Sequence, residues 1–269
     1  MPVTDADVER WLREDLGHHD VTNDVPGETT GRLVATESGV VAGLAAARAV
    51  FAYLDCGVET THEDGDRVDP GDVVLTVEGA AQDVLRAERV AVNAVGHASG
   101  IASKTRRAVD AAREESDHVA IAATRKTTPG LRGVEKRAVA AGGGDTHRLD
   151  LSHMVMVKDN HVAEMGLERA VAHFRERASF ATQIEVEVET PADAARAAEA
   201  GADIVLLDNM TPAETREAVD RLPDDVLAEA SGGITVADIP AYAATGADVI
   251  SLGSLTHSAA SLDYSFRTG

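Results

Sequence analysis

The second half of the chain repeats a pattern of short apolar runs, loops and alanine-rich segments with helical spacing. Six runs have the length and β-branched content of strands: residues 119–123, 154–157, 184–188, 204–207, 226–230 and 249–252. The last four begin roughly twenty residues apart, the repeat expected of βα units. The pattern predicts an α/β barrel with helices such as 192–200 and 212–222, and a seventh strand hidden near residues 149–151.

The first hundred residues follow a different pattern, which predicts an α+β unit. Thr4–Leu16 has amphipathic helical spacing, with Thr4 and Asp7 in capping-box positions. Strands are expected at residues 31–37 and 40–42, a helix at 44–54, and short strands within 58–78, where EDGDRVDPGD marks acidic turns. Residues 82–112 are expected to be largely helical, with an interruption near His97–Gly100.

Composition supports a helix-covered parallel sheet. Of 269 residues, 44% are hydrophobic but only 3% are aromatic, so the core must consist of Val, Ala, Leu and Ile. The lone Cys56 excludes an internal disulfide framework and a multi-cysteine metal site. The first residues lack a signal-peptide pattern, and no apolar run approaches the roughly 18 residues that span a bilayer. We therefore expect a cytoplasmic protein.

The net charge of −21 disfavours nucleic acid and membrane surfaces as partners, because both carry negative charge. Strong acidity with scarce lysine also suggests a proteome adapted to high salt. One window departs from this charge. Residues 123–161, ATRKTTPGLRGVEKRAVAAGGGDTHRLDLSHMVMVKDNH, hold seven lysines and arginines against four acidic residues, a balance of +3. Residues 135–137 fit a solvated helix, but the cations at segment ends indicate a pocket for a small, multiply anionic substrate.

Chemically distinctive residues follow the predicted strands. They are Arg125, Lys158, Glu187, Asp208, Ser231 with Gly232 and Gly233, and Gly253. The carboxyl ends of parallel barrel strands converge on one face, which predicts a shared site. Ser231–Gly233 and Gly253–Ser254 offer backbone N–H groups at turns before helices, a pattern typical of phosphate sites.

Strand alternation in IEVEVE places Glu185, Glu187 and Glu189 on one face. We expect that face to line the barrel interior; the alternative is an edge strand with one face in water. Glu187 and Asp208 together suit Mg²⁺ or ribose hydroxyls. His147 adjoins Arg148 and is expected to contact substrate, whereas His257 fits a ligand contact and helix-start packing equally well. No HExxH pattern occurs, so a protein-caged transition metal is not expected.

One family resembles this chain along nearly its whole length. The quinolinate phosphoribosyltransferases, the carboxylating nicotinate-nucleotide pyrophosphorylases, have a signature similar to TRKTTPGLRGVEKRAVAAGGGDTHRLDLSHMVMVKDNH. The resemblance continues in order through EDLGHHDVTND, RAERVAVNAVGHASGIA, IEVEVE, ADIVLLDNM, EASGGIT and VISLGSLTHSA. It implies an N-terminal α/β sandwich (residues 1–104), an incomplete, about seven-stranded α/β barrel (105–254) and a tail (255–269) returning to the first domain.

The resemblance also implies a reaction. Quinolinate and phosphoribosyl pyrophosphate give nicotinate mononucleotide, pyrophosphate and carbon dioxide, with Mg²⁺ required, in de novo NAD synthesis. The expected substrate contacts are Arg125, His147, Arg148 and Lys158 for quinolinate, Lys126 and Thr127 for the phosphoribosyl donor, Glu187 and Asp208 for its ribose, metal and pyrophosphate, and Ser231, Gly232, Gly233, Gly253 and His257 for its 5′-phosphate. Lys158, Glu187 and Asp208 are the expected catalytic residues, and any metal contact is direct or through water or substrate.

The family further implies a shared site, in which Arg89 reaches the quinolinate pocket of a neighbouring subunit. The minimum unit is then a dimer, and a hexamer of dimers is also compatible. One departure occurs at His19, where the family often has Gly, and we expect only a local loop change. Two alternatives remain: a paralogue acting on another pyridine carboxylate, disfavoured by His147 and Arg148, and a non-catalytic phosphate-binding barrel.

Overall fold

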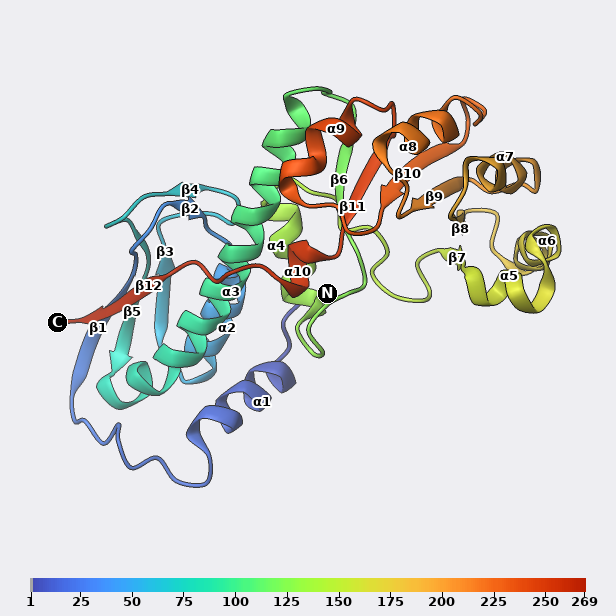
Figure 1. Cartoon of the computed structure of the whole chain (residues 1–269). Coiled ribbons are helices and arrows are strands. Elements are labelled where there is room, and N and C mark those ends of the chain that lie inside the picture. Colours follow the sequence, from blue (N-terminus) through green and yellow to red (C-terminus); the bar gives the residue numbers. More distant parts are fainter. Residues whose placement is uncertain (1) are drawn as a thin grey trace. The chain divides into compact units, whose positions relative to one another are not determined.

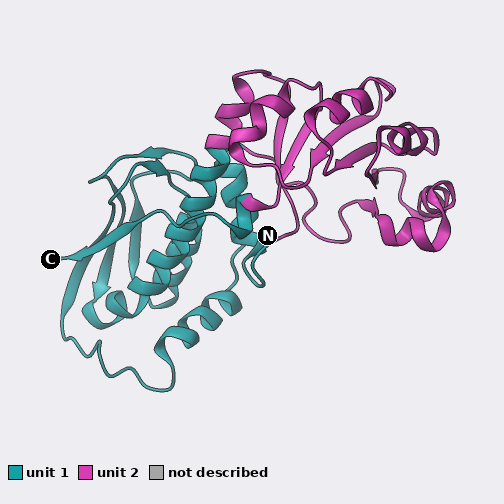
Figure 2. Ribbon diagram, in the orientation of Figure 1, with its two compact units in different colours: residues 1–106, 127–143, 255–269 teal, residues 107–126, 144–254 magenta. Residues whose placement is uncertain are grey.

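A computed structural model describes residues 2–269, which form two compact units (Figure 2). Unit 1 comprises the residues up to Arg106 together with 127–143 and 255–269, and unit 2 comprises 107–126 and 144–254. Each unit has its own sheet and its own apolar core. The domain boundaries expected at residues 104 and 254 stay a prediction. No helix within residues 2–269 is both long and apolar enough to cross a bilayer.

Unit 1 is built on an antiparallel sheet with the strand order β12-β1-β5-β3, beside a two-stranded sheet, β2-β4 (Figure 1). Its elements are α1 (Asp5–Leu16), β1 (Glu28–Ala35), β2 (Gly39–Val40), α2 (Leu44–Tyr53), β3 (Gly57–Thr60), β4 (Arg67–Val68), β5 (Val73–Ala80), the first part of α3 (Ala81–Arg113), α4 (Arg132–Ala141) and β12 (Tyr264–Thr268). The capping box predicted at the start of α1 is confirmed, since Thr4 Oγ1 accepts from Asp7 N and Thr4 N donates to Asp7 Oδ2.

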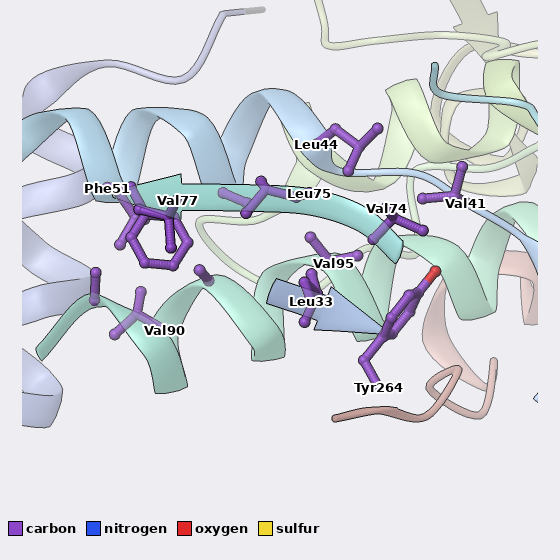
Figure 3. Close-up of a cluster of buried hydrophobic side chains, with 14 of the residues drawn as sticks. Leu33, Val41, Leu44, Phe51, Val74, Leu75, Val77, Val90, Val95 and Tyr264 are labelled. Atoms are coloured by element: carbon purple, nitrogen blue, oxygen red, sulfur yellow. The ribbon is translucent and has the colours of Figure 1, made fainter. Parts of the chain in front are cut away.

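Val, Leu and Ala make up most of the core of unit 1, as the composition predicts, but Phe51 and Tyr264 are also part of it. Figure 3 shows Phe51 of α2, Leu75 and Val77 of β5, and Val90 and Val95 of α3 in this cluster. Phe51, Leu75 and Val77 have no exposed surface. Removing such a side chain from water contributes about 1.5–3 kcal/mol, so the helices are held to the sheet mainly by this burial.

Helix α3 is continuous from Ala81 to Arg113, so the predicted interruption near residues 97–100 is wrong. The glycines there serve packing instead. Gly96 O accepts a hydrogen bond from Leu262 N at 2.9 Å, and a Cβ added at Gly100 would lie 2.0 Å from Ala260 O. The missing side chains thus let the C-terminal segment approach the helix backbone.

Replacing Gly100 with alanine is expected to destabilise the protein by about 2–3 kcal/mol, because the new methyl group would collide with Ala260 O. In an unobstructed helix the same change would stabilise by up to about 1 kcal/mol. Thermal unfolding of G100A checks the sign. Gly57→Ala is the matched control, since its Cβ would meet nothing nearer than 3.7 Å. An unchanged melting temperature for G100A would contradict the close approach.

Unit 2 contains a six-stranded parallel sheet with the order β6-β11-β10-β9-β8-β7 (Figure 1). Its elements are β6 (Ala120–Ala123), β7 (Val155–Val157), α5 (Asp159–Met165), α6 (Leu167–Arg177), β8 (Ile184–Val188), α7 (Pro191–Glu199), β9 (Ile204–Asp208), α8 (Pro212–Val219), β10 (Leu227–Ser231), the 3-10 helix η1 (Val236–Asp238), α9 (Ile239–Ala243) and β11 (Val249–Leu252), followed by α10 (Ser254–His257). All six predicted strands are present within two residues of their expected bounds. The sheet is an incomplete barrel, as expected.

The seventh strand predicted near residues 149–151 is absent from this described region, where the chain forms a bend and a turn. Asp145 supplies a single parallel bridge to Ala122 instead, with hydrogen bonds from Asp145 N to Ile121 O and from Ala123 N to Asp145 O. Leu149 and Leu151 have the alternating spacing of a strand, but Leu151 is exposed and no ladder forms there.

The two faces of the unit 2 sheet differ in chemistry. One face carries aliphatic residues that are buried against alanines of α6, α7 and α8; the strand residues are Val157, Ile184, Val186, Val188, Val205 and Leu207. Because side chains alternate along a strand, the residues between them point to the opposite face. The helices therefore cover the apolar face and leave the polar one to form a site.

Candidate active site

The polar face of the sheet carries Glu185, Glu187, Asp208, Glu229 and Ser231. Glu187 and Glu229 both pair with Leu206 in the strand register, and Ser231 pairs with Asp208. Adjacent strands lie about 4.8 Å apart, so these groups form a compact patch near the carboxyl ends of β8, β9 and β10. The alternative of a water-facing edge strand is wrong, because β8 lies between β7 and β9 and Glu185 is fully buried.

Lys158 and Glu187 form an ion pair at this edge. Lys158 follows β7 as the N-cap of α5, and its Nζ donates to Glu187 Oε2. The Lys158 side chain is 43% exposed and that of Glu187 is 18% exposed. The pair therefore stands at the mouth of the polar face, where an anionic group can approach the ammonium.

Asp208 occupies a place of negative potential. Burial raises the pKa of its carboxyl, and the charges of Glu187 and Glu189 raise it further, while Lys158 and Lys126 oppose them. Asn209 Nδ2 donates to Asp208 Oδ2 at 2.7 Å. A carboxylate whose pKa is raised by other carboxylates is stabilised by a cation, and oxygen donors of this kind suit Mg²⁺.

His147 lies between two buried carboxylates. Its Nε2 is 3.0 Å from Glu229 Oε2 and 3.6 Å from Glu185 Oε1. Burial alone would lower the pKa of His147, but hydrogen bonding and attraction by Glu185 and Glu229 outweigh it and raise the pKa to about 10. Because a carboxylate only accepts, Nε2 must carry the proton. With its pKa raised to about 10, the ring carries a second proton and a positive charge at neutral pH.

The same three groups also have spacing that a divalent cation accepts, since one atom from each lies within 4.8 Å of the others. A proton on His147 accounts for the geometry without an ion, because the shorter contact has hydrogen-bond length. The backbone of His147 adopts a left-handed conformation, φ 51°, and its N–H donates to Asp145 Oδ1 at 2.5 Å. This uncommon local conformation directs the chain into the site.

Arg148 is a buried guanidinium, only 7% exposed, beside a second one. Burial lowers its pKa, and so does repulsion from Arg125. Arg148 donates from one terminal nitrogen to the Met156 sulfur at 3.1 Å, while its Nε is buried and has no hydrogen-bond partner among the described residues. A buried guanidinium with an unused Nε donor, beside a second guanidinium, is a donor set suited to a small anion.

The turn after β10 carries the glycines expected to bind phosphate. Gly232 and Gly233 have positive φ, 95° and 65°, and a Cβ on Gly232 would lie 2.5 Å from Asn209 N. Nothing lies within 4 Å of a Cβ on Gly233, so that side of the turn is open. The helices that follow, η1 and α9, are short. Asp238 caps the N-terminus of η1, where its carboxylate accepts from Thr235 N. The turn itself, rather than a helix dipole, would have to bind an anion.

Three expected site residues belong to unit 1. Arg89 is on α3 with a 60% exposed side chain, 3.7 Å from Glu88. Thr127 Oγ1 accepts from Arg132 Nε at 3.0 Å. His257 ends α10 and pairs with Ser258 through Nδ1 and Oγ, 2.6 Å apart. Unit 2 holds Arg125, Lys126, His147, Arg148, Lys158, Glu187, Asp208, Ser231, Gly232, Gly233 and Gly253.

The sequence interpretation missed two residues of this face. Glu229 was not singled out, although it stands two positions before Ser231 and must therefore share its face. Asn209 was read only as part of ADIVLLDNM, yet it adopts φ 57° and holds both Asp208 and the backbone of Ser231. Alternation of side chains along the strand LAEAS could have identified Glu229. No sequence signal identified Asn209.

Two family models match the chain and together cover most of it. They are the quinolinate phosphoribosyl transferase N-terminal domain, at residues 19–99, and the C-terminal domain, at residues 101–267. A probable nicotinate-nucleotide pyrophosphorylase (carboxylating) of Methanothermobacter thermautotrophicus is 46% identical over 97% of both chains. The human nicotinate-nucleotide pyrophosphorylase (carboxylating) is 43% identical, over 99% of this chain and 92% of its own. The crystal structure of NadC from Streptococcus pyogenes has a TM-score of 0.93 at 40% identity, covering 100% and 99% of the two chains.

Proposed function

Since this chain belongs to the quinolinate phosphoribosyltransferase family, we propose that buried Arg148 and half-buried Arg125 and His147 hold the two carboxylates of quinolinate and that the acidic edge of the sheet takes the phosphoribosyl donor. The reaction is the carboxylating pyrophosphorylase reaction of NAD biosynthesis. Quinolinate and phosphoribosyl pyrophosphate give nicotinate mononucleotide, pyrophosphate and carbon dioxide.

The Arg125 and Arg148 pair carries this proposal. Burial of Arg148 and repulsion from Arg125 both disfavour the charged form of Arg148, while Glu185, Glu187 and Glu229 oppose them. A dicarboxylate supplies two negative charges and planar oxygens that match guanidinium donors. His147, kept charged by Glu185 and Glu229, adds a third cation on the same side. A monocarboxylate such as nicotinate would leave part of this positive charge unpaired.

The acidic edge supports binding of the donor. Glu187 and Asp208 offer carboxylate oxygens for ribose hydroxyls or Mg²⁺, and a bound cation would offset the burial and the carboxylate repulsion that raise the pKa of Asp208. The residues present therefore fit the metal. When bound, Mg²⁺ neutralises charge that develops on the departing pyrophosphate. The open turn at Ser231–Gly233 lies beside Asp208 in the sheet register and suits the 5′-phosphate.

Bond changes follow from this arrangement. The bond from ribose C1 to pyrophosphate breaks, and its electron pair leaves with the pyrophosphate, near Lys158. Glu187 and Asp208 stabilise the positive charge that appears on the ribose. The quinolinate ring nitrogen then bonds to C1. Carbon dioxide leaves the adjacent ring carbon, whose electron pair is stabilised by the now positive ring nitrogen and by the cations that hold the carboxylates, and that carbon takes up a proton.

An active site shared between subunits is part of the same proposal. Arg89 is exposed on α3 and pairs only weakly with its neighbour Glu88, at 3.7 Å, so it is suited to contact another chain. The minimum working unit would be a dimer. A cytoplasmic location, where a biosynthetic enzyme meets its substrates, belongs to the proposal as well.

The test is a product assay with protein, Mg²⁺ and phosphoribosyl pyrophosphate. We expect labelled carbon dioxide and nicotinate mononucleotide from quinolinate, and at least about 100-fold less nucleotide from nicotinate, because the latter has one carboxylate fewer. The assay is run in low and high salt, given the acidic composition. Equal rates would favour a paralogue of different specificity. Donor binding without product in either salt would favour a non-catalytic barrel.

Asp208→Asn is expected to lower kcat about 100-fold and to raise the Mg²⁺ concentration needed for half-maximal rate. Thermal stability should stay equal or rise, because removing a carboxylate with a raised pKa relieves repulsion from Glu187. Steady-state rates across a Mg²⁺ titration and a melting curve check both. Exposed Asp224→Asn is the control. A wild-type Mg²⁺ response in D208N would remove Asp208 from the metal site.

A further inference from the structure

A fully buried carboxylate in unit 1 has no part in the proposed chemistry. Glu135 is in the first turn of α4 with no exposed surface. Its Oε1 lies 3.0 Å from His97 Nε2, and Thr128 N donates to both oxygens, at 3.3 and 3.1 Å. A buried charge is costly unless it is hydrogen-bonded, and these bonds supply the compensation. Glu135 thus ties α3 to the chain segment that enters α4.

That segment is a turn whose shape is encoded locally. Leu131 N donates to Thr128 O at 3.0 Å, and Gly130 has φ 83°. A type II turn requires positive φ at its third position, which glycine supplies, and favours proline at its second. The sequence T-P-G-L therefore determines the local shape of the turn, but it does not determine the position of the turn relative to α3 and α4.

The first three residues of the turn are exposed to solvent. These residues, Thr128, Pro129 and Gly130, line a cavity of about 400 Å³, together with His97. Open space beside the turn leaves room for it to shift. The hydrogen bonds from Thr128 N to Glu135 are accordingly the contacts that fix its first residue, and His97 in turn orients the carboxylate.

We propose that Glu135, oriented by His97, is a positioning residue for Lys126 and Thr127. This inference rests on the proposed function, in which Lys126 and Thr127 contact the phosphoribosyl donor. They immediately precede the amide that Glu135 holds. Arg132, the first residue of α4, also donates a hydrogen bond to Thr127 Oγ1. We expect loss of the Glu135 carboxylate to affect the donor more than quinolinate, because His147, Arg148 and Lys158 lie outside segment 124–131 and Arg125 lies close to the end of β6, on the far side of Lys126 from the turn.

The experiment compares Glu135→Gln with the wild-type protein. Glutamine keeps the size of the side chain, but its NH₂ group cannot accept. Thr128 N is then left with one acceptor atom in place of two, unless the amide oxygen faces His97 instead, and His97 Nε2 must change from donor to acceptor where it faces the NH₂ group. We expect the Kd and KM for phosphoribosyl pyrophosphate to rise about tenfold, while those for quinolinate change by less than about threefold. Amide hydrogen exchange in residues 124–131 should accelerate in the absence of any substrate.

His97→Leu is the second variant, needed should E135Q fold poorly. It removes the ring donor but leaves Thr128 N bonded to Glu135, so we expect a smaller change in the same direction. Val139→Ala is the matched control: Val139 is a fully buried residue of α4, one turn beyond Glu135. It should lower the melting temperature without changing the ratio of the two KM values.

The outcomes separate the two proposals. Failure of the wild-type protein to form product would overturn the proposed function, while the exchange measurement would still report on the turn. Unchanged exchange in E135Q would overturn the positioning role. So would equal losses for both substrates, or a V139A variant of equal stability that reproduces the donor effect, because a purely structural role predicts those results.

Discussion

Replacing Arg148 with alanine is expected to raise the Kd for quinolinate about 100-fold, while the Kd for phosphoribosyl pyrophosphate changes by less than about threefold. The guanidinium is 7% exposed, and its Nε has no hydrogen-bond partner among the described residues, so its loss removes a charge-assisted contact formed only with a ligand. Calorimetric titration with each substrate separately measures both constants.

Arg148→Lys should restore little of this affinity, because an ammonium lacks the planar fork that matches a carboxylate. Arg221→Ala provides the control, since Arg221 is an exposed residue paired with Glu217. Equal losses for both substrates in R148A would refute the assigned role. Nearly equal binding of quinolinate by R148A and wild type would do so as well.

Glu229→Gln is expected to change how quinolinate binding depends on pH. In the wild-type protein His147 stays charged up to about pH 10, so the affinity should be nearly constant between pH 7 and 9. The variant loses the nearer carboxylate, at 3.0 Å, and the pKa of His147 falls. At pH 9 we expect E229Q to bind quinolinate at least about tenfold more weakly than wild type, with a smaller difference at pH 6.

The pH dependence of the free energy of unfolding is a second test of the protonation of His147. A histidine whose folded pKa is raised to about 10 contributes stability that is fully present below its ordinary pKa of 6.5. That contribution is lost as the pH rises through 10. The wild-type free energy of unfolding should therefore fall by a few kcal/mol from this group between pH 6.5 and 10, and by less in E229Q. Denaturant unfolding at several pH values measures the difference.

Two results would contradict this account of His147. One is a parallel pH profile for E229Q and wild type in both binding and unfolding. The other is stabilisation of the wild type, but not of E229Q, by Zn²⁺ or Mn²⁺ alone, which would mean that His147, Glu185 and Glu229 hold a metal rather than a proton. Glu164→Gln, at an exposed residue, is the control.

Local sequence was enough to predict most elements. The capping box of α1, the six parallel strands and the helices that follow them all depend on spacing within a short segment, which the sequence displays directly. The inward orientation of Glu185 and Glu187 also followed from alternation, because β8 is regular. Errors arose where glycine or a short apolar alternation was interpreted locally, as at Gly100 and at Leu149 and Leu151.

By itself the sequence determined which residue types exist, the period of each segment, and the order of motifs that identifies the family. Only the tertiary structure decided which charges meet. His147 and Glu229 are 82 positions apart and lie 3.0 Å from one another because two strands and an irregular loop bring them together. A pKa depends on such distances and on burial, and neither is contained in a local pattern. The same holds for Glu135, whose role depends on contacts with His97 and Thr128 formed by folding.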